Sequence, residues 1–249
     1  MYYLQQGTDV KNNGVIFDRA GSSFAQLQKG MIDWDKVLDG INWFHFSAIA
    51  ASLTASAAEV CEEALQAASA KGIAISVDLN YRNKLWQYVK QPHEIMPGLV
   101  KYCDVVMGNI WAANMMLAVP LNESLINQRE KKAYLEQASE TSRIIQQQFP
   151  KVKTVANTFR FNRYEGIQYY TALFHQQLFV SAEYAADEVL DKVGSGDCFM
   201  GGLIYGLNND HAPQQTLNLA TAAAYNKLFF KGDTTDQTVS QVTATVKNA

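Results

Sequence analysis

The chain has 249 residues, a formal net charge of −3 and a sequence pI of about 5.8. With 48% hydrophobic and 18% charged residues, its composition is typical of a globular protein that has ample material for one large core. The basic residues are scattered, which argues against a nucleic-acid-binding surface, and no apolar run reaches the length needed to span a bilayer.

The first half of the chain alternates between predicted strands and helices. Residues 2–19, "YYLQQGTDVKNNGVIFDR", are predicted to form two short strands joined by a turn at positions 12–14. A strand is predicted over 41–50, and an Ala/Glu-rich helix over 52–71 is ended by Gly72. The segments that follow predict two strands, each followed by a short helix; the strands are 73–80 and 104–109, and the helices 94–103 and 110–117.

The second half begins with a polar helix over 121–148, which Pro150 ends before a strand over 151–159. Residues 166–173 and 175–184 are rich in Tyr and Phe and lack a helical stripe, so they predict a hairpin. A further strand is expected to end near Leu190. The remaining predicted helices are 196–207, 214–230 and a weaker C-terminal segment.

Short apolar strands that alternate with helices indicate a mainly parallel sheet covered by helices on both faces. The chain is expected to form a single domain over residues 1–249. The opening hairpin, residues 1–20, does not fit the alternation and is interpreted as an edge flap or lid.

The three cysteines lie far apart, show no CxxC spacing and are odd in number. This pattern argues against a disulfide framework and favours a reducing compartment. We therefore expect a cytoplasmic protein.

The segment "DKVGSGDCFMGG", residues 191–202, carries the clearest chemical signal. A strand followed by Gly194-Ser195-Gly196 and a helix places backbone N–H groups at a helix N-terminus, where anions bind. Asp197, in the first helical turn, can accept a proton from a hydroxyl while those N–H groups hold a transferring phosphoryl group. The same pattern also fits a capping aspartate beside glycines that permit tight packing. It is neither a P-loop, since no Lys-Ser/Thr follows, nor a dinucleotide fingerprint, since Phe199 replaces the third glycine.

This segment resembles the C-terminal signature of the ribokinase-like PfkB carbohydrate kinases, Asp-Thr-x-Gly-Ala-Gly-Asp-x-Phe-x-x-Gly. The resemblance implies a ribokinase-like three-layer α/β/α sandwich with a mainly parallel central sheet and a small β lid. It also implies that Asp197 is the catalytic base and that the N–H groups of Gly194, Ser195 and Gly196 bind the transferring phosphate. Lys192 stands where the family usually has a small hydroxyl residue.

Three further stretches resemble the 2-keto-3-deoxygluconate kinase branch: "FHFSAIAASL", "ISVDLNYRNKLW" and "VIFDRAGSSFAQL". This resemblance implies that Arg19 and Arg82 bind the substrate carboxylate and neighbouring hydroxyls, with Asn80 close by. Guanidinium groups suit that task because they bind carboxylates bidentately. Phe17 takes a lid position that is often tyrosine. Without the resemblance, a surface role for Arg19 and a helix-capping ion pair for Arg82 stay open.

The nucleotide site is implied by three more stretches. "NLATAAAYNKLFFKGD" resembles the Ala-rich helix that ends in a glycine, here Gly232, beside the adenine pocket. "VANTFRFN" stands where many family members have a Gly-containing turn against the nucleotide, and the resemblance implies that Thr158 and Arg160 face the phosphates or the ribose. The family's Asn-x-x-Glu is represented by Asn109, with Ala112 at the glutamate position. The implied cofactors are ATP and Mg²⁺, with the metal carried on the nucleotide phosphates and no protein ligand assigned to it.

The resemblance implies ATP-dependent phosphorylation of a primary hydroxyl on a small sugar acid, most of all 2-keto-3-deoxygluconate. It implies no nucleic-acid or membrane partner, and a homodimer formed through the lid strands. Family members begin with a strand and a glycine-rich segment that precede the lid, so this chain is expected to be N-terminally incomplete. Two alternatives stay open: a kinase for a neutral sugar or nucleoside, and a non-catalytic remnant that binds sugar or nucleotide.

Overall fold

The computed structural model describes residues 2–4, 15–17, 21–88, 90–127, 130–163 and 166–247. The chain divides into two compact units, one formed by Phe17–Ala156 and the other by Tyr2–Ile16 with Asn157–Ala249. Within the described ranges, no helix combines the length and the apolar character needed to cross a membrane.

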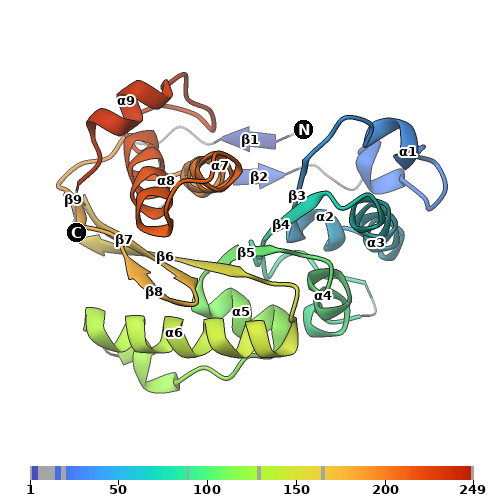
Figure 1. Cartoon of the computed structure of the whole chain (residues 1–249), viewed down its shortest axis with the longest axis horizontal. Coiled ribbons are helices and arrows are strands. Elements are labelled where there is room, and N and C mark those ends of the chain that lie inside the picture. The colour runs from blue at the N-terminus through green and yellow to red at the C-terminus, as the bar shows by residue number, and fades with distance from the viewer. Residues whose placement is uncertain are drawn as a thin grey trace. The chain divides into compact units, whose positions relative to one another are not determined.

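The first unit alternates strands and helices along the chain, as the sequence predicts (Figure 1). Its elements are η1 (Phe24–Gln26), α1 (Trp34–Val37), β3 (Trp43–Ser47), α2 (Ala48–Ala51), α3 (Ala55–Ala70), β4 (Ala74–Asp78), α4 (Pro92–Val100), β5 (Val105–Gly108), α5 (Ile110–Leu117), η2 (Glu123–Asn127) and α6 (Lys131–Gln148). Strands β3, β4 and β5 are parallel neighbours, with Phe46 opposite Val77 and Val77 opposite Val106. Their buried apolar side chains form part of the core of this unit.

Two predicted boundaries in this unit were wrong. The strand predicted over 41–50 ends at Ser47, whose hydroxyl accepts a hydrogen bond from the Ile49 N–H (3.4 Å) and caps α2. The helix predicted over 121–148 is divided into η2 and α6. At Ser47 a short local hydrogen-bonding pattern ends the strand, and composition alone does not predict such an ending.

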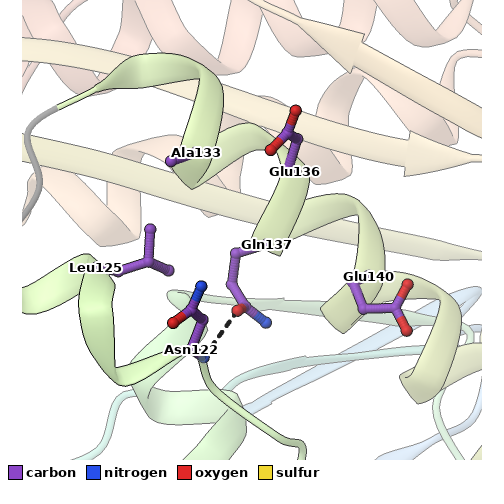
Figure 2. Close-up of a pocket in the computed structure, with 6 residues that line it drawn as sticks. All are labelled: Asn122, Leu125, Ala133, Glu136, Gln137 and Glu140. Carbon is purple, nitrogen blue, oxygen red and sulfur yellow. Dashed lines mark hydrogen bonds between the residues drawn. The ribbon is translucent and has the colours of Figure 1, made fainter.

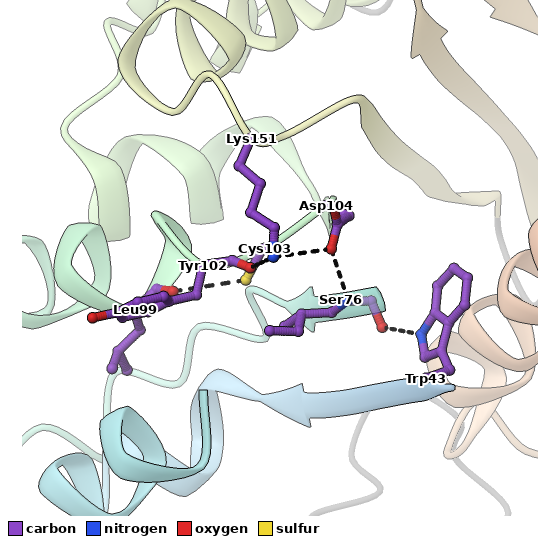
Figure 3. Close-up of polar contacts among 8 residues, drawn as sticks. Trp43, Ser76, Leu99, Tyr102, Cys103, Asp104 and Lys151 are labelled. Carbon is purple, nitrogen blue, oxygen red and sulfur yellow. Dashed lines mark hydrogen bonds and ion pairs between the residues drawn. The ribbon is translucent and has the colours of Figure 1, made fainter. Parts of the chain in front are cut away.

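A polar contact fastens the start of β4 to the segment that precedes β6. The Asp104 carboxylate accepts a hydrogen bond from the Ile75 N–H (2.9 Å) and pairs with the Lys151 ammonium (3.3 Å). Figure 3 shows this carboxylate between the lysine and the strand. Lys151 also donates to the Tyr102 carbonyl (2.6 Å), so one lysine and one aspartate hold together three stretches of backbone.

The second unit contains most of the antiparallel structure. Its elements are β1 (Tyr2–Leu4), most of β2 (Val15–Phe17), the larger part of β6 (Thr154–Arg163), β7 (Gly166–His175), β8 (Gln177–Val180), β9 (Tyr184–Ala186), α7 (Ser195–Asn208), α8 (Pro213–Lys227) and α9 (Val239–Ala244). Strand β6 begins in the first unit and continues into the second, and the strand order is β3-β4-β5-β6-β7-β8 with β9 also paired to β7. The antiparallel pairing of β7 with β8 confirms the predicted hairpin. The strand predicted to end near Leu190 ends instead at Ala186.

Helices α7 and α8 lie side by side, and α8 packs against β7 (Figure 1). Two glycines of α7 make the close approach possible. A Cβ added at Gly202 would lie 2.7 Å from the Ala220 Cα, and one added at Gly206 would lie 2.7 Å from the Thr216 Cγ2. Gly202 and Gly206 therefore serve helix packing, while Gly194, which precedes Asp197, shapes the turn described next.

Candidate active site

The turn that precedes α7 is anchored by Asp191. One oxygen of this carboxylate accepts the Val193 N–H (2.9 Å) and the other accepts the Gly232 N–H (3.1 Å). The N–H groups of Leu190 and Asp191 both donate to the Leu228 carbonyl (2.8 and 3.1 Å). The turn is thus fastened to the segment that follows α8, which no local sequence pattern predicts.

Gly194 gives the turn its shape. It is the N-cap of α7, it is buried and its φ of 78° is in the left-handed region. A Cβ at this position would lie 2.1 Å from the Asp233 carbonyl oxygen, so no other residue fits without moving the backbone. The sequence prediction that this glycine serves a tight turn is therefore confirmed.

Three N–H groups at the start of α7 are available to an anion. The first hydrogen bond within the helix runs from the Cys198 N–H to the Gly194 carbonyl (2.9 Å), so the N–H groups of Ser195, Gly196 and Asp197 precede the intrahelical ladder. Gly196 is exposed, and a Cβ added to it would meet nothing within 4 Å. The helix dipole adds partial positive charge at this end, so the position favours a phosphate group.

Asp197 lies in the first turn of α7 and is exposed to solvent. No described residue donates a hydrogen bond to its carboxylate or forms an ion pair with it. It does not cap the helix, because Gly194 is the N-cap and no side chain accepts a capping hydrogen bond there. The carboxylate is therefore free to accept a proton from a bound hydroxyl.

Positive side chains adjoin the turn from β6 and from the loop itself. Arg160 donates from Nη1 to the Ser195 hydroxyl (3.1 Å), and this hydroxyl donates to the Lys192 carbonyl (3.0 Å). The Lys192 ammonium donates to the Asn162 side-chain oxygen (2.9 Å). Burial lowers the pKa of Lys192, and the neighbouring Arg160 charge lowers it further. The turn thus has two cations in its immediate surroundings.

Arg160 and Thr158 were predicted from the sequence, whereas Asn162 was not. Successive side chains of a strand point to opposite faces, so residues 158, 160 and 162 share one face of β6. That period of two was the signal that would have found Asn162 once Arg160 had been chosen. Thr158 is half-buried on this row. Gly232, also predicted here, has a φ of 83° and is tied to Asp191 as described above.

The predicted sugar-binding residues of the first unit follow the end of β4. The buried Asp78 accepts a hydrogen bond from the Asn80 N–H (3.1 Å), which bends the chain as it leaves the strand. The exposed Arg82 then starts a turn in which its carbonyl accepts the Leu85 N–H (3.0 Å). The buried Trp86 ends this loop with a φ of 62° and donates its backbone N–H to the Ser52 carbonyl (3.1 Å). Asn80 and Arg82 are therefore presented on one short, anchored loop.

Asn109 is the N-cap of α5, and its side-chain oxygen accepts the Ala112 N–H (2.8 Å). Ala112 itself is buried. The asparagine therefore has a structural role in this unit, and its predicted contact with nucleotide stays a prediction. Of the other expected substrate residues, Phe17 ends β2, and its side chain, like the whole of Arg19, lies outside the described residues. The predicted lid, residues 1–20, is described only at β1 and β2.

A hollow of about 300 Å³ lies elsewhere in the first unit, between α6 and the η2 segment (Figure 2). It is lined by Asn122, Leu125, Ala133, Glu136, Gln137 and Glu140. The Asn122 N–H donates to the Gln137 side-chain oxygen (2.9 Å) across it. None of the residues predicted from the sequence lines this hollow.

Parallel strands, flanking helices and a glycine turn at the N-terminus of α7 together define an α/β protein of the ribokinase-like class. The chain belongs to the pfkB family of carbohydrate kinases, whose model matches residues 2–238. Membership of this family confirms the fold class predicted from the sequence.

Three known proteins show how far the similarity extends. The 2-dehydro-3-deoxygluconokinase of Thermotoga maritima is 29% identical, with a TM-score of 0.85 over 98% of this chain and 71% of its own. A PfkB family carbohydrate kinase from Listeria grayi is 25% identical, with a TM-score of 0.81 over 98% of this chain and 72% of its own. The 2-dehydro-3-deoxygalactonokinase of Haloferax volcanii is 35% identical over 85 residues, which are 34% of this chain and 26% of that protein.

Proposed function

We propose that the chain is an ATP-dependent kinase that phosphorylates a primary hydroxyl of a small sugar acid, with 2-keto-3-deoxygluconate the first candidate. The observation that carries this proposal is the free Asp197 carboxylate beside the open N–H groups of α7. PfkB kinases use ATP, which fits an anion-binding turn. The names of two relatives, a gluconokinase and a galactonokinase of the 2-dehydro-3-deoxy type, support the substrate class.

The residues at the turn fit the phosphates of a nucleotide. The N–H groups of Ser195, Gly196 and Asp197 offer donors, and Arg160 and Lys192 offer positive charge nearby. ATP, when bound, supplies the phosphoryl group, and Mg²⁺ neutralises part of its charge. In the described ranges no cluster of three His, Cys, Asp or Glu side chains is placed to hold a metal, so the nucleotide itself would carry most of the magnesium coordination.

Asp197 would accept the proton of the sugar hydroxyl as that oxygen attacks. The N–H groups of Ser195 and Gly196 would hold the phosphoryl oxygens in place, at no cost of reorganisation because the helix already orients them. Arg160 would act through the Ser195 hydroxyl, which it fixes in one orientation. Phosphoryl transfer by these residues would require only that the reactants are positioned, that one base accepts the proton and that the turn is positively charged.

The sugar acid would be held by residues of the first unit. The exposed guanidinium of Arg82 suits a carboxylate, and Asn80 offers an amide to a neighbouring hydroxyl. Arg19 is proposed as the second carboxylate ligand on the family resemblance alone. Thr158 and Gly232, in the second unit, and Asn109, in the first, are proposed to contact the nucleotide.

The experiment that tests the proposal is ADP release with Mg-ATP and 2-keto-3-deoxygluconate, with ribose and fructose as comparison sugars. Asp197→Asn is expected to lower kcat about 10²- to 10⁴-fold, since it removes the general base. Asp236→Asn, also an exposed aspartate of the second unit, is the control for the charge change and is expected to keep the parent rate. Equal activity of the parent chain and Asp197→Asn would refute the assignment of the base.

A second variant tests the substrate class. Arg82→Met is expected to raise KM for the sugar acid about 10- to 100-fold and to leave the rates with ribose or fructose unchanged. An equal effect on acidic and neutral sugars would favour the alternative of a neutral sugar or nucleoside kinase.

One observation favours a non-catalytic binding protein as the second candidate. The position at which the family carries a metal-organising glutamate is the buried Ala112, and Asn109 is engaged in capping its N–H. Tight ATP binding without ADP release, unchanged by Asp197→Asn, would establish this candidate instead. Dimerisation through residues 1–20 and a cytoplasmic location stay predictions.

A further inference from the structure

Lys227 is a charged residue that solvent does not reach. It is the last residue of α8, and its exposed fraction is 0%. Its ammonium donates a hydrogen bond to the Phe230 carbonyl (3.0 Å), in the segment that follows the helix. Lysine is seldom fully buried, because burial removes the water that stabilises its charge. An apolar residue of similar length would fill the same space at a lower cost, so the retained charge calls for an explanation.

The position of Lys227 in the fold offers an explanation for its buried charge. The next residue, Leu228, accepts the N–H groups of Leu190 and Asp191, and Asp191 in turn accepts the Gly232 N–H. The lysine therefore lies where the segment 228–233 meets the anion-binding turn. By holding the Phe230 carbonyl, it fixes the curve of the chain that brings Gly232 to Asp191.

The charge of Lys227 also reaches the first turn of α7. Burial raises the pKa of the Cys198 thiol, and the Asp197 carboxylate raises it further, while Lys227 acts in the opposite direction. Gly202 packs against Ala220 and Gly206 against Thr216, so α7 and α8 run antiparallel and the end of α8 that carries Lys227 lies beside the first turn of α7. A positive charge at that place attracts an anion bound at the adjoining N–H groups.

We propose that Lys227 is a positioning residue whose buried positive charge strengthens the binding of phosphate groups at the N-terminus of α7 while its hydrogen bond to Phe230 shapes the 228–233 segment. The inference rests on the proposed function. Lys227 does not touch the ligand, since it is fully buried. Its effect should therefore depend on the charge of the ligand and not on the ligand's shape.

The test compares two ligands that differ in charge. Binding of AMP-PNP with Mg²⁺ and of adenosine is measured by calorimetry for the parent chain and for Lys227→Gln, which keeps a donor for Phe230 and removes the charge. We expect Lys227→Gln to weaken AMP-PNP binding about tenfold or more and to leave adenosine binding within about twofold. Lys247→Gln, the same change at an exposed lysine of this unit, is the control and is expected to bind both ligands as the parent does.

Each outcome decides the matter. Equal weakening of both ligands shows a purely structural role and overturns the proposal, as does unchanged binding of both. Lys227→Met, which fills the volume without charge, is the second variant should Lys227→Gln fail to fold. Failure of both variants to fold also makes the residue structural and overturns the proposal. A parent chain that binds neither ligand refutes the proposed function together with this inference, whereas a parent that releases ADP beside an unchanged Lys227→Gln refutes this inference alone.

Discussion

Replacing Gly194 by alanine is expected to loosen the anion-binding turn. The added Cβ would lie 2.1 Å from the Asp233 oxygen and 2.9 Å from the Asp233 carbonyl carbon, and both are backbone atoms that no rotamer change can move away. Relief requires a backbone shift that lengthens the first contact to at least 3.0 Å. The positive φ of 78° adds strain of about 1–3 kcal/mol for a non-glycine residue, and overpacking adds about 1–3 kcal/mol. The predicted loss is therefore about 2–6 kcal/mol of unfolding free energy.

Urea unfolding followed by far-UV circular dichroism measures this loss. Tryptophan fluorescence serves as a separate probe, because all four tryptophans lie within Phe17–Ala156, in the other unit. Gly196→Ala is the matched control, since its added Cβ meets nothing within 4 Å, and alanine favours a helix by up to about 1 kcal/mol over glycine. We expect the Gly194→Ala transition seen by circular dichroism to move about 1 M or more to lower urea. Coincident curves for Gly194→Ala and the parent, or an equal loss in Gly196→Ala, would refute the reasoning.

Three further predictions concern stability and reactivity. Gly202→Ala should lower the free energy of urea unfolding by about 1–3 kcal/mol, because the added Cβ would meet the Ala220 backbone. Gly201→Ala, whose added Cβ would meet nothing within 4 Å, should leave this free energy unchanged or raise it. Equal effects of the two changes would contradict the packing described for α7 and α8. Asp104→Ala removes the acceptor of the Ile75 N–H and the ion-pair partner of Lys151, so it should lower the unfolding free energy by about 1–3 kcal/mol, as measured by tryptophan fluorescence. The control is Asp35→Ala, which removes the ion-pair partner of Lys71. Because the Asp35 side chain is 90% exposed, this change should alter the unfolding free energy by less than about 0.5 kcal/mol. Cys61 and Cys103 are buried and should resist iodoacetamide at pH 8 in the folded chain and react after unfolding, because burial raises the pKa of Cys61 to about 12 and also raises that of Cys103. Rapid labelling of these two thiols in the folded chain would show that they are not buried as described.

The same thiols set the sign of a pH effect on stability. A group whose pKa is raised by folding does not change the free energy of unfolding below its ordinary pKa, because the folded and the unfolded chain then both carry the proton. Above the ordinary thiol value of 9.0, the unfolded chain loses its protons first, so the folded state loses stability as the pH rises. Thermal unfolding at pH 8 and pH 10, compared with that of a Cys61→Ala variant, measures the contribution of this thiol. An equal drop in both proteins would assign the effect to other groups.

Much of the fold follows from local patterns that the sequence displays. The helix predicted over 110–117 has the observed bounds of α5, because Asn109 is a strong cap directly before an apolar run. The Tyr- and Phe-rich hairpin is also confirmed, since aromatic residues without helical spacing favour strands. The prediction of a strand that ends near Leu190 was wrong, because β9 ends at Ala186 and the Leu190 N–H donates to the Leu228 carbonyl, far along the chain, instead of to a neighbouring strand. Composition cannot show such a partner.

In the candidate site, too, the features with a local sequence pattern were predicted and those that depend on distant segments were not. The glycine turn and Asp197 were found from their spacing, because a helix N-terminus has a local signature. The anchoring role of Asp191 and the contact of Lys192 with Asn162 were missed, since each joins segments that are distant in sequence. Arg160 was named from a family resemblance, and its hydrogen bond to Ser195 gives it a physical reason to be at the turn. Arg19 lies outside the described residues and rests on the resemblance alone.

The bond between Asp191 and Gly232 joins residues that are 41 positions apart, which affects how the chain matures during synthesis. At about 5–20 residues per second, the ribosome takes roughly 2–8 s after Asp191 to reach Gly232. During that interval the Asp191 carboxylate lacks the Gly232 N–H that later donates to its Oδ2 oxygen, so the turn before α7 is not yet held in its final form. Under the proposed function, a nucleotide that binds the folded turn would stabilise only chains that have been synthesised beyond Gly232. By this coupling the ligand would favour completed molecules over nascent ones.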